Sequence, residues 1–193
     1  MTSAGGARLG RSSIAALDRH LVVARRAEVT YDHVGSTLSP HGVANRRRRS
    51  LQRVMAAPAQ AFDAALHGLR TWVPQRHLGA RIHPVDATAT LGETLLMVLA
   101  LGPVEVLAPN RIVWVVDEAD RFGYAYGTLP GHPAAGEECF LVERLDGDSL
   151  KLTVTVDSAP ATVATRVLAP LVVQVQHLAV RRYLGGMGKH LRG

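Results

Sequence analysis

The sequence predicts an α+β fold in which a curved antiparallel sheet wraps around a long C-terminal helix. Residues 81–157 favour strands, because apolar and polar residues alternate with a period of two over much of this region. The gaps between these strands are short, which is typical of an antiparallel meander. Residues 162–184 favour one long helix, because apolar residues recur every three or four positions from Val167 to Leu178. Such a helix can cover the apolar face of a curved sheet.

The chain has 193 residues, enough for one domain with its own hydrophobic core. We expect that domain at residues 28–186, after an N-terminal extension at 1–27 and before a tail at 187–193. The extension is expected to be flexible or helical, since Ser12 and Ser13 precede apolar residues at helical spacing. No apolar run reaches the roughly 18 residues that a membrane helix needs, so we expect no membrane span.

The elements can be justified in chain order. Residues 28–34 alternate weakly and favour a first strand, and the run Arg46–Arg49 favours a solvated loop or a helix start. Residues 59–72 predict a helix from their apolar spacing, and Pro74 is expected to end it. Asp146 with the glycine after it is a strong hairpin-turn signal. Further strands are expected at Arg81–Val85, Thr94–Leu101, Val104–Leu107 (alternatively the start of the next strand), Arg111–Asp117, Glu137–Leu145 and Leu150–Val156, with one more beginning at Phe122.

The stretch from Phe122 to Leu129 is expected to pair with residues 137–145 as a hairpin. Phe122, Tyr124 and Tyr126 fall on one face of this strand, and glycine and alanine fall on the other. A face of such small residues lets another backbone or a ligand approach closely. The same period of two predicts one shared face for three residues of the preceding strand: Ile112, Trp114 and Val116.

The central hairpin also carries a family resemblance. YGTLPGHP at Tyr126–Pro133, followed by GEE and an apolar strand, resembles the signature of the DUF1990 family, also called UPF0548, which has no assigned activity. The resemblance covers roughly residues 28–185, and it implies the helix-grip fold, which is Bet v 1/START-like and occurs in small-ligand binders and some enzymes. Shorter pieces match the family in order: Tyr31 to Gly35, Asn110 to Val113, Ser158 to Ala161, and Gln176 with Tyr183.

The first functional hypothesis is a binding module that holds a small, mostly apolar ligand between the sheet and the C-terminal helix. Aromatic side chains would shape the pocket, and a few polar side chains would orient the ligand. We expect no cofactor and no metal site. The candidate ligand-binding residues are Arg111, Trp114, Tyr124, Tyr126, Thr128, His132, Glu137 and Glu138.

The second hypothesis is an enzyme of the same fold, in which His132 and either Glu137 or Glu138 act as acid and base. The two glutamates are adjacent in a strand and point to opposite faces, so at most one faces the concave side. A structural role is the alternative to both hypotheses. In that case Thr128 and His132 form hydrogen bonds with backbone groups of the turn, and one glutamate forms an ion pair with Arg111.

The third hypothesis treats Arg46–Arg49 as a patch for nucleic acid or an anionic surface. The net charge of +6 lies in the N-terminal part, where residues 1–81 hold 13 Arg and 4 acidic residues, about +9, against about −3 in the rest. No aromatic residues interleave with these arginines for base stacking, so we expect no nucleic-acid partner. The single Cys139 excludes an internal disulfide and fits a cytoplasmic protein. The expected assembly is a monomer or a homodimer.

Overall fold

The computed structural model describes residues 5–39, 41, 43–44, 46–56, 61–145, 148–161, 182–183, 185, 187 and 190–191. The predicted helix at 162–184 therefore lies outside the described residues, apart from Arg182 and Tyr183, which are helical. The turn predicted at Asp146 lies outside them too. The strands on either side of that turn do pair as a hairpin, with Leu145 opposite Ser149.

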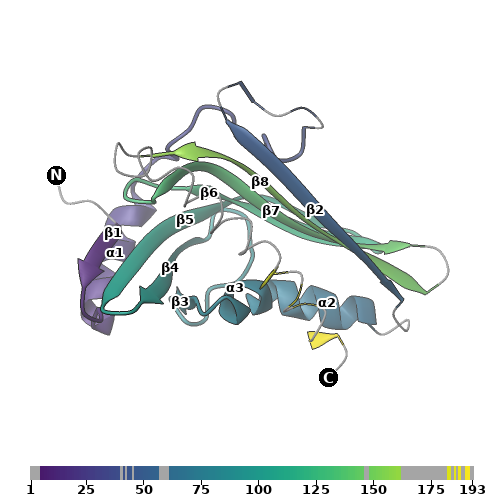
Figure 1. Cartoon of the computed structure of the whole chain (residues 1–193), viewed down its shortest axis with the longest axis horizontal. Coiled ribbons are helices and arrows are strands. Elements are labelled where there is room, and N and C mark those ends of the chain that lie inside the picture. The colour runs from purple at the N-terminus through teal and green to yellow at the C-terminus, as the bar shows by residue number, and fades with distance from the viewer. Residues whose placement is uncertain are drawn as a thin grey trace.

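One antiparallel sheet dominates the described structure and arches over two short helices (Figure 1). Its strand order is β2-β8-β7-β6-β5-β4-β3, and β1 pairs with β5 beside this path. The run from β8 to β3 follows the chain order in reverse, so this part of the sheet is the predicted meander. The elements are β1 (Gly6–Leu9), α1 (Ile14–Arg25), β2 (Arg47–Ala56), α2 (Ala61–Arg70), α3 (Val73–His77), β3 (Arg81–His83), β4 (Thr94–Leu101), β5 (Val104–Asp117), β6 (Arg121–Thr128), β7 (Ala134–Leu145) and β8 (Ser149–Pro160).

Two predictions for the N-terminal half are wrong. Residues 28–34 form no strand, because the chain crosses over the sheet there and Thr30 N–H donates to the Thr128 carbonyl at 3.0 Å. The run Arg46–Arg49 is neither a loop nor a helix start, since Arg47 begins β2, which pairs with β8 along its whole length. Charged side chains on such an edge strand discourage pairing with a second sheet.

Residues 6–25 supply a strand and a helix that pack against the rest of the domain. The helix predicted after Ser13 is confirmed as α1, and the Ser13 side chain caps it by accepting a hydrogen bond from Ala16 N–H at 3.3 Å. Strand β1 pairs with the first part of β5, from Gly6 to Leu9. No helix in the described part of the chain is long and apolar enough to cross a membrane.

The helix predicted at residues 59–72 is confirmed as α2, which is followed by a second short helix. Pro74 lies in the first turn of α3, where a proline leaves no intrahelical hydrogen bond unmade. Trp72 forms the corner between the two helices with a left-handed backbone (φ 64°). Pro74 therefore begins a helix instead of only ending one.

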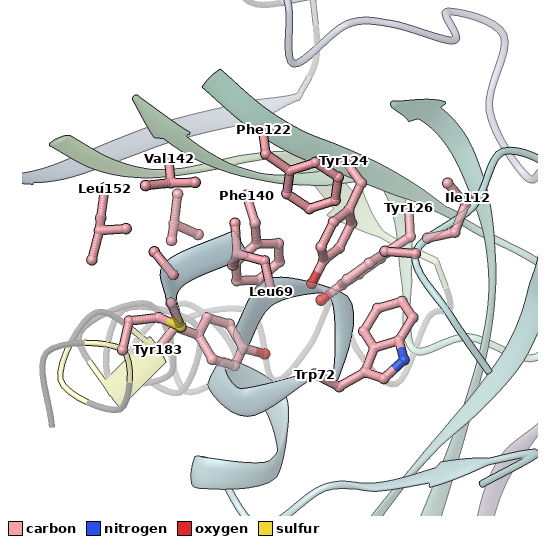
Figure 2. Close-up of a cluster of buried hydrophobic side chains, with 14 of the residues drawn as sticks. Leu69, Trp72, Ile112, Phe122, Tyr124, Tyr126, Phe140, Val142, Leu152 and Tyr183 are labelled. Carbon is pink, nitrogen blue, oxygen red and sulfur yellow. The ribbon is translucent and has the colours of Figure 1, made fainter. Parts of the chain in front are cut away.

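The concave face of the sheet packs on α2 and α3 and forms the main hydrophobic core (Figure 2). Phe122, Tyr124 and Tyr126 all point into this core from β6, which confirms the predicted aromatic face. Phe140 of β7 stacks beside them, with its ring centroid 5.5 Å from that of Tyr124. Burying one large apolar side chain contributes roughly 1.5–3 kcal/mol, so this face is a major source of stability.

The convex face carries a smaller core beneath α1. Leu17 and Leu21 of α1 pack there against Leu96 of β4 and Leu107 of β5. The neighbouring Leu95 belongs to the concave core instead. Alternate side chains of β4 therefore pack into two separate buried layers, one on each face of the sheet.

A β-bulge in β5 changes which face Trp114 occupies. Ile112 lies opposite Tyr126, but Trp114 lies opposite Ala125, because the register shifts between these two positions. Val115 then packs against the concave core. The prediction that Ile112 and Trp114 share a face is wrong, since an inserted residue reverses the alternation that follows it.

Arg111 anchors the end of α1 to the sheet. Its guanidinium donates to the backbone carbonyls of Ala24 (3.1 Å) and Arg25 (3.0 Å). Its Nε donates to the Thr94 hydroxyl at 3.1 Å. The last carbonyls of a helix have no intrahelical partner, so Arg111 satisfies groups that would otherwise need water.

We expect Arg111→Met to lower the free energy of unfolding by about 1–3 kcal/mol, because two carbonyls at the end of α1 lose a charged donor. Arg121→Met is the matched control, since Arg121 forms an exposed pair with Glu118. The control should lose much less stability, because an exposed ion pair contributes little. Chemical denaturation measures both values, and equal losses would contradict the anchoring role.

Candidate functional site

A carboxyl group and two phenol hydroxyls meet on the concave face. The Tyr126 hydroxyl donates a hydrogen bond to Glu138 Oε2, and the two residues lie opposite each other in β6 and β7. The Tyr183 hydroxyl hydrogen bonds with Tyr126 in turn. In Figure 2, Tyr126 approaches from the sheet and Tyr183 from the C-terminal part of the chain. We call Tyr126, Glu138 and Tyr183 the tyrosine–glutamate cluster.

The surroundings of this cluster favour uncharged side chains. Burial raises the pKa of Glu138 to about 7, and the hydrogen bond from Tyr126 opposes that rise by stabilising the carboxylate. Burial, and then the nearby charge of Glu138, raise the pKa of Tyr126 and of Tyr183 well above the ordinary value. Glu138 therefore exists in both protonation states at neutral pH and can accept or donate a proton.

Aromatic rings line the cluster on its apolar side. The ring centroid of Tyr126 lies 5.8 Å from that of Phe140, and Phe140 lies 5.1 Å from Tyr183 in an edge-to-face contact. Gln75 Nε2 donates to the Tyr124 hydroxyl at 3.1 Å. Such walls give van der Waals contact to a flat organic molecule, while the hydroxyls give it direction.

A small cavity opens beside the cluster. Its lining includes Leu69 of α2, Phe140 of β7, Leu152 of β8, Tyr183 and Met187. The cavity volume is about 10 Å³, which admits about one water molecule. The cavity is therefore too small for a larger ligand in this conformation.

Glu137 faces the convex side, as predicted for a residue adjacent to Glu138. Its carboxylate accepts hydrogen bonds from the Tyr31 hydroxyl (2.9 Å), Gly35 N–H (2.6 Å), Thr37 N–H (3.2 Å) and the Thr37 hydroxyl (3.0 Å). These donors occupy both oxygens of a side chain that can only accept. Glu137 thus fastens the segment at residues 31–37 to the outside of the sheet.

The small-residue face of β6 accommodates Tyr31. A Cβ atom at Gly127 would lie 2.1 Å from the Tyr31 hydroxyl oxygen, so only glycine fits there. The close approach predicted for this face is confirmed, and another part of the chain makes it. Arg46 covers Tyr31 from outside, with its guanidinium carbon 4.9 Å from the ring centroid.

The side chains of the Arg46–Arg49 run do not share one face, because successive side chains of β2 point to opposite sides of the sheet. Arg48 lies opposite Asp157 and donates to the Ser36 carbonyl at 2.9 Å, whereas Arg49 lies opposite Val156 of the concave core. The four arginines therefore do not form one patch.

Asp157 is fully buried, and its carboxylate makes no hydrogen bond with any described residue. The described residues also contain no group of three or more His, Cys, Asp or Glu that could hold a metal ion.

Thr128 and His132 form hydrogen bonds with backbone N–H groups at the end of the hairpin. Thr128 Oγ1 accepts a hydrogen bond from Gly136 N–H at 3.0 Å, and it lies 2.6 Å from the Thr30 hydroxyl. His132 Nδ1 accepts from Ala134 N–H at 3.0 Å. Burial lowers the pKa of His132 to about 4, so its ring is neutral at neutral pH. Within the residues that the structure describes, His132 makes no hydrogen bond with a glutamate.

Sequence reasoning did not select Asn110 as a site residue. Asn110 lies on the concave face between Ala108 and Ile112, opposite Leu95 of the main core, and it is fully buried. Its Nδ2 donates to the Ala108 carbonyl at 2.9 Å. Its Oδ1 has no hydrogen-bond partner in the described part of the chain. The available signal was an amide at an inward position of an otherwise apolar strand.

Comparison with known proteins gives a family and a fold. The family described as "Domain of unknown function (DUF1990)" matches residues 30–186. A UPF0548 protein of Deinococcus radiodurans is 37% identical over 130 residues, which cover 62% of this chain and 64% of that relative. The chain therefore spans less than two thirds of the relative's length.

Two solved structures resemble this chain in fold. Hypothetical protein jhp0584 of Helicobacter pylori is 13% identical with a TM-score of 0.63, over 86% of this chain and 99% of that chain. The Zhui aromatase/cyclase of Streptomyces sp. R1128 is 16% identical with a TM-score of 0.55, over 77% of this chain and 98% of that chain. Together with the curved antiparallel sheet, these likenesses establish the predicted helix-grip α+β fold.

We expect Gly127→Ala to lower the free energy of unfolding by about 1–3 kcal/mol, because the new methyl group meets the ring of Tyr31. Gly185→Ala is the matched control, since a Cβ there meets nothing within 4 Å. Chemical denaturation compares the two variants. If Gly127→Ala is as stable as the control, Tyr31 is not held tightly against β6.

We also expect an unusual pH dependence of stability from Glu138. Its pKa is about 7 in the folded protein against an ordinary 4.5, so the folded protein binds more protons between these values. The free energy of unfolding therefore falls as the pH rises from about 4.5 to about 7. Glu138→Gln removes this fall, so the stability of the variant relative to wild type should rise by about 3 kcal/mol between pH 4.5 and pH 8.

Urea denaturation at a series of pH values measures this gain. Glu118→Gln is the control, because Glu118 is exposed and its hydrogen bond with Arg121 lowers its pKa. The control should show no gain at high pH. A wild-type pH profile that survives in Glu138→Gln would exclude Glu138 as its source.

Proposed function

This chain belongs to the DUF1990 family, and on that premise we propose that it binds a small, mostly apolar ligand against the concave face of its sheet. The observation that carries the proposal is the tyrosine–glutamate cluster, which sets a titratable carboxyl and two hydroxyls among aromatic rings. Apolar walls with a few convergent polar groups are typical of small-molecule sites.

The binding roles follow from the two faces of the sheet. Tyr124 and Phe140 would contact the apolar body of the ligand, and Glu138 with Tyr126 would orient its polar group. Arg111, Trp114 and Glu137 lie on the convex face, so the proposal gives them no ligand contact. Thr128 and His132 hold the end of the hairpin.

Ligand entry requires the cover of the concave face to open. The cavity beside Phe140 admits about one water molecule, so the side chains of Tyr183 and Met187 must swing aside for a larger guest. Residues that cover a site in this way come from the less stable parts of a fold. In the proposal these two side chains act as the movable wall of the pocket.

Catalysis is the second candidate function, with Glu138 as the group that moves a proton. The observation that favours it is the pKa of Glu138, about 7, next to the Tyr126 hydroxyl. The aromatase/cyclase that shares the fold is an enzyme by its name, which supports this candidate. The proposal gives His132 no part, because its Nδ1 is used within the turn and it makes no hydrogen bond with a glutamate among the described residues.

The proposal includes a cytoplasmic location and no nucleic-acid partner. Cys139 is a buried free thiol, which fits a reducing compartment. The arginines of β2 are divided between two faces, so they do not track a phosphate backbone as one patch. A monomer or a homodimer is the assembly that we propose for the functional protein.

Binding can be tested with 2-methoxynaphthalene, a neutral aromatic probe. We expect saturable quenching of tryptophan fluorescence in the wild-type protein. Met187→Ala should tighten binding at least about threefold, because it widens the space beside Phe140 and Tyr183. Val54→Ala, at an exposed position of β2, should leave the affinity unchanged. No saturable quenching in either wild type or Met187→Ala would refute the proposal.

A further inference from the structure

The side-chain oxygen of Asn110 is a buried acceptor that has no donor among the described residues. Its side chain is fully buried on the concave face, where Ile112 follows it in the same strand and Leu95 lies opposite. Its Nδ2 is already satisfied by the Ala108 carbonyl, but its Oδ1 has no partner among the described residues. Leaving such an acceptor unpaired costs stability, so a donor from outside the chain would be held there.

We infer that Asn110 Oδ1 accepts a hydrogen bond from the ligand, which is therefore a neutral, mostly apolar molecule bearing an O–H or N–H donor. This inference rests on the proposed binding function and specifies the chemistry of its ligand. A molecule of the same shape without a donor would leave Oδ1 unpaired and would bind more weakly. Specificity of this kind arises from the site's own buried polar group.

The pairing of β5, β6 and β7 fixes the distance between Asn110 and the tyrosine–glutamate cluster. Asn110 lies opposite Thr128, and Tyr126, two residues earlier in β6, lies opposite Glu138. Asn110 and Glu138 are thus two strands and two residues apart, or roughly 12 Å between Cα atoms. Both side chains project from the concave face, so one ligand lying against that face can contact both.

The surroundings of these two groups favour a neutral ligand. The wall between them is made of Ile112, Tyr126 and other side chains of the main core, and a charged group there would lose its hydration. An anion would also meet the Glu138 carboxylate. The expected ligand is therefore a compact ring system with a hydroxyl or amine group on its edge.

Two probes of equal ring size test the inference. 2-Naphthol carries an O–H donor, and 2-methoxynaphthalene carries the same oxygen without the proton. We expect the wild-type protein to bind 2-naphthol at least about fivefold more tightly. Asn110→Leu should reduce this preference to near unity while leaving the affinity for 2-methoxynaphthalene unchanged or tighter.

A control variant outside the proposed site keeps Asn110. Val54→Ala, at an exposed position of β2, should retain the preference for 2-naphthol. Asn110→Val, whose side chain suits a strand, replaces Asn110→Leu if circular dichroism shows that the latter does not fold. Equal affinities for the two probes in wild type, or a preference that survives both Asn110 variants, would overturn the role of Asn110. Binding of neither probe, even by Met187→Ala, would instead refute the proposed binding function and this inference with it.

Discussion

Strand β6 lies between two buried layers, and the rest of the structure depends on both of its faces fitting packed protein. Its aromatic face supplies Phe122, Tyr124 and Tyr126 to the concave core. Its other face must be nearly flat, because Tyr31 lies against it and leaves no room for a Cβ at Gly127. A slip of one residue would place rings where Tyr31 belongs, so this alternation also holds the register of its neighbours.

The same alternation separates two chemically identical side chains. Glu137 and Glu138 are neighbours, yet Glu137 accepts hydrogen bonds from residues 31–37, while Glu138 receives its bond from Tyr126 among aromatic rings. Four donors make Glu137 a structural anchor. Burial raises the pKa of Glu138 to about 7, a range where proton exchange is useful, because the one phenol donor opposes that rise only in part. Glu137 thus holds the scaffold, whereas in our proposal the tyrosine–glutamate cluster contacts the ligand.

Local pattern predicted what depends on neighbouring residues only. The aromatic and small faces of β6, the opposite orientations of the glutamates and the bounds of β4 follow from a period of two. The face of Trp114 could not be predicted in this way, because the bulge before it depends on how β5 pairs with β6. The strand formed by the arginines of β2 could not be predicted either, since it depends on pairing with β8, which is distant in sequence. An unpaired acceptor such as Asn110 becomes visible only once the residues opposite it are known.

The concave face sacrifices stability in ways that packing alone does not require. An apolar residue at position 110 would avoid an unpaired acceptor, which costs about 1–3 kcal/mol. A glutamine at position 138 would avoid the cost of ionising a buried carboxyl above pH 7. On the convex face, Gly127 and Glu137 fit their partners closely, although the buried Asp157 carboxylate has no hydrogen-bond partner among the described residues. On the concave face, Asn110 and Glu138 stand among apolar and aromatic side chains, and polar groups that cost stability in such surroundings are typical of a site kept for function, which is why we place the ligand there.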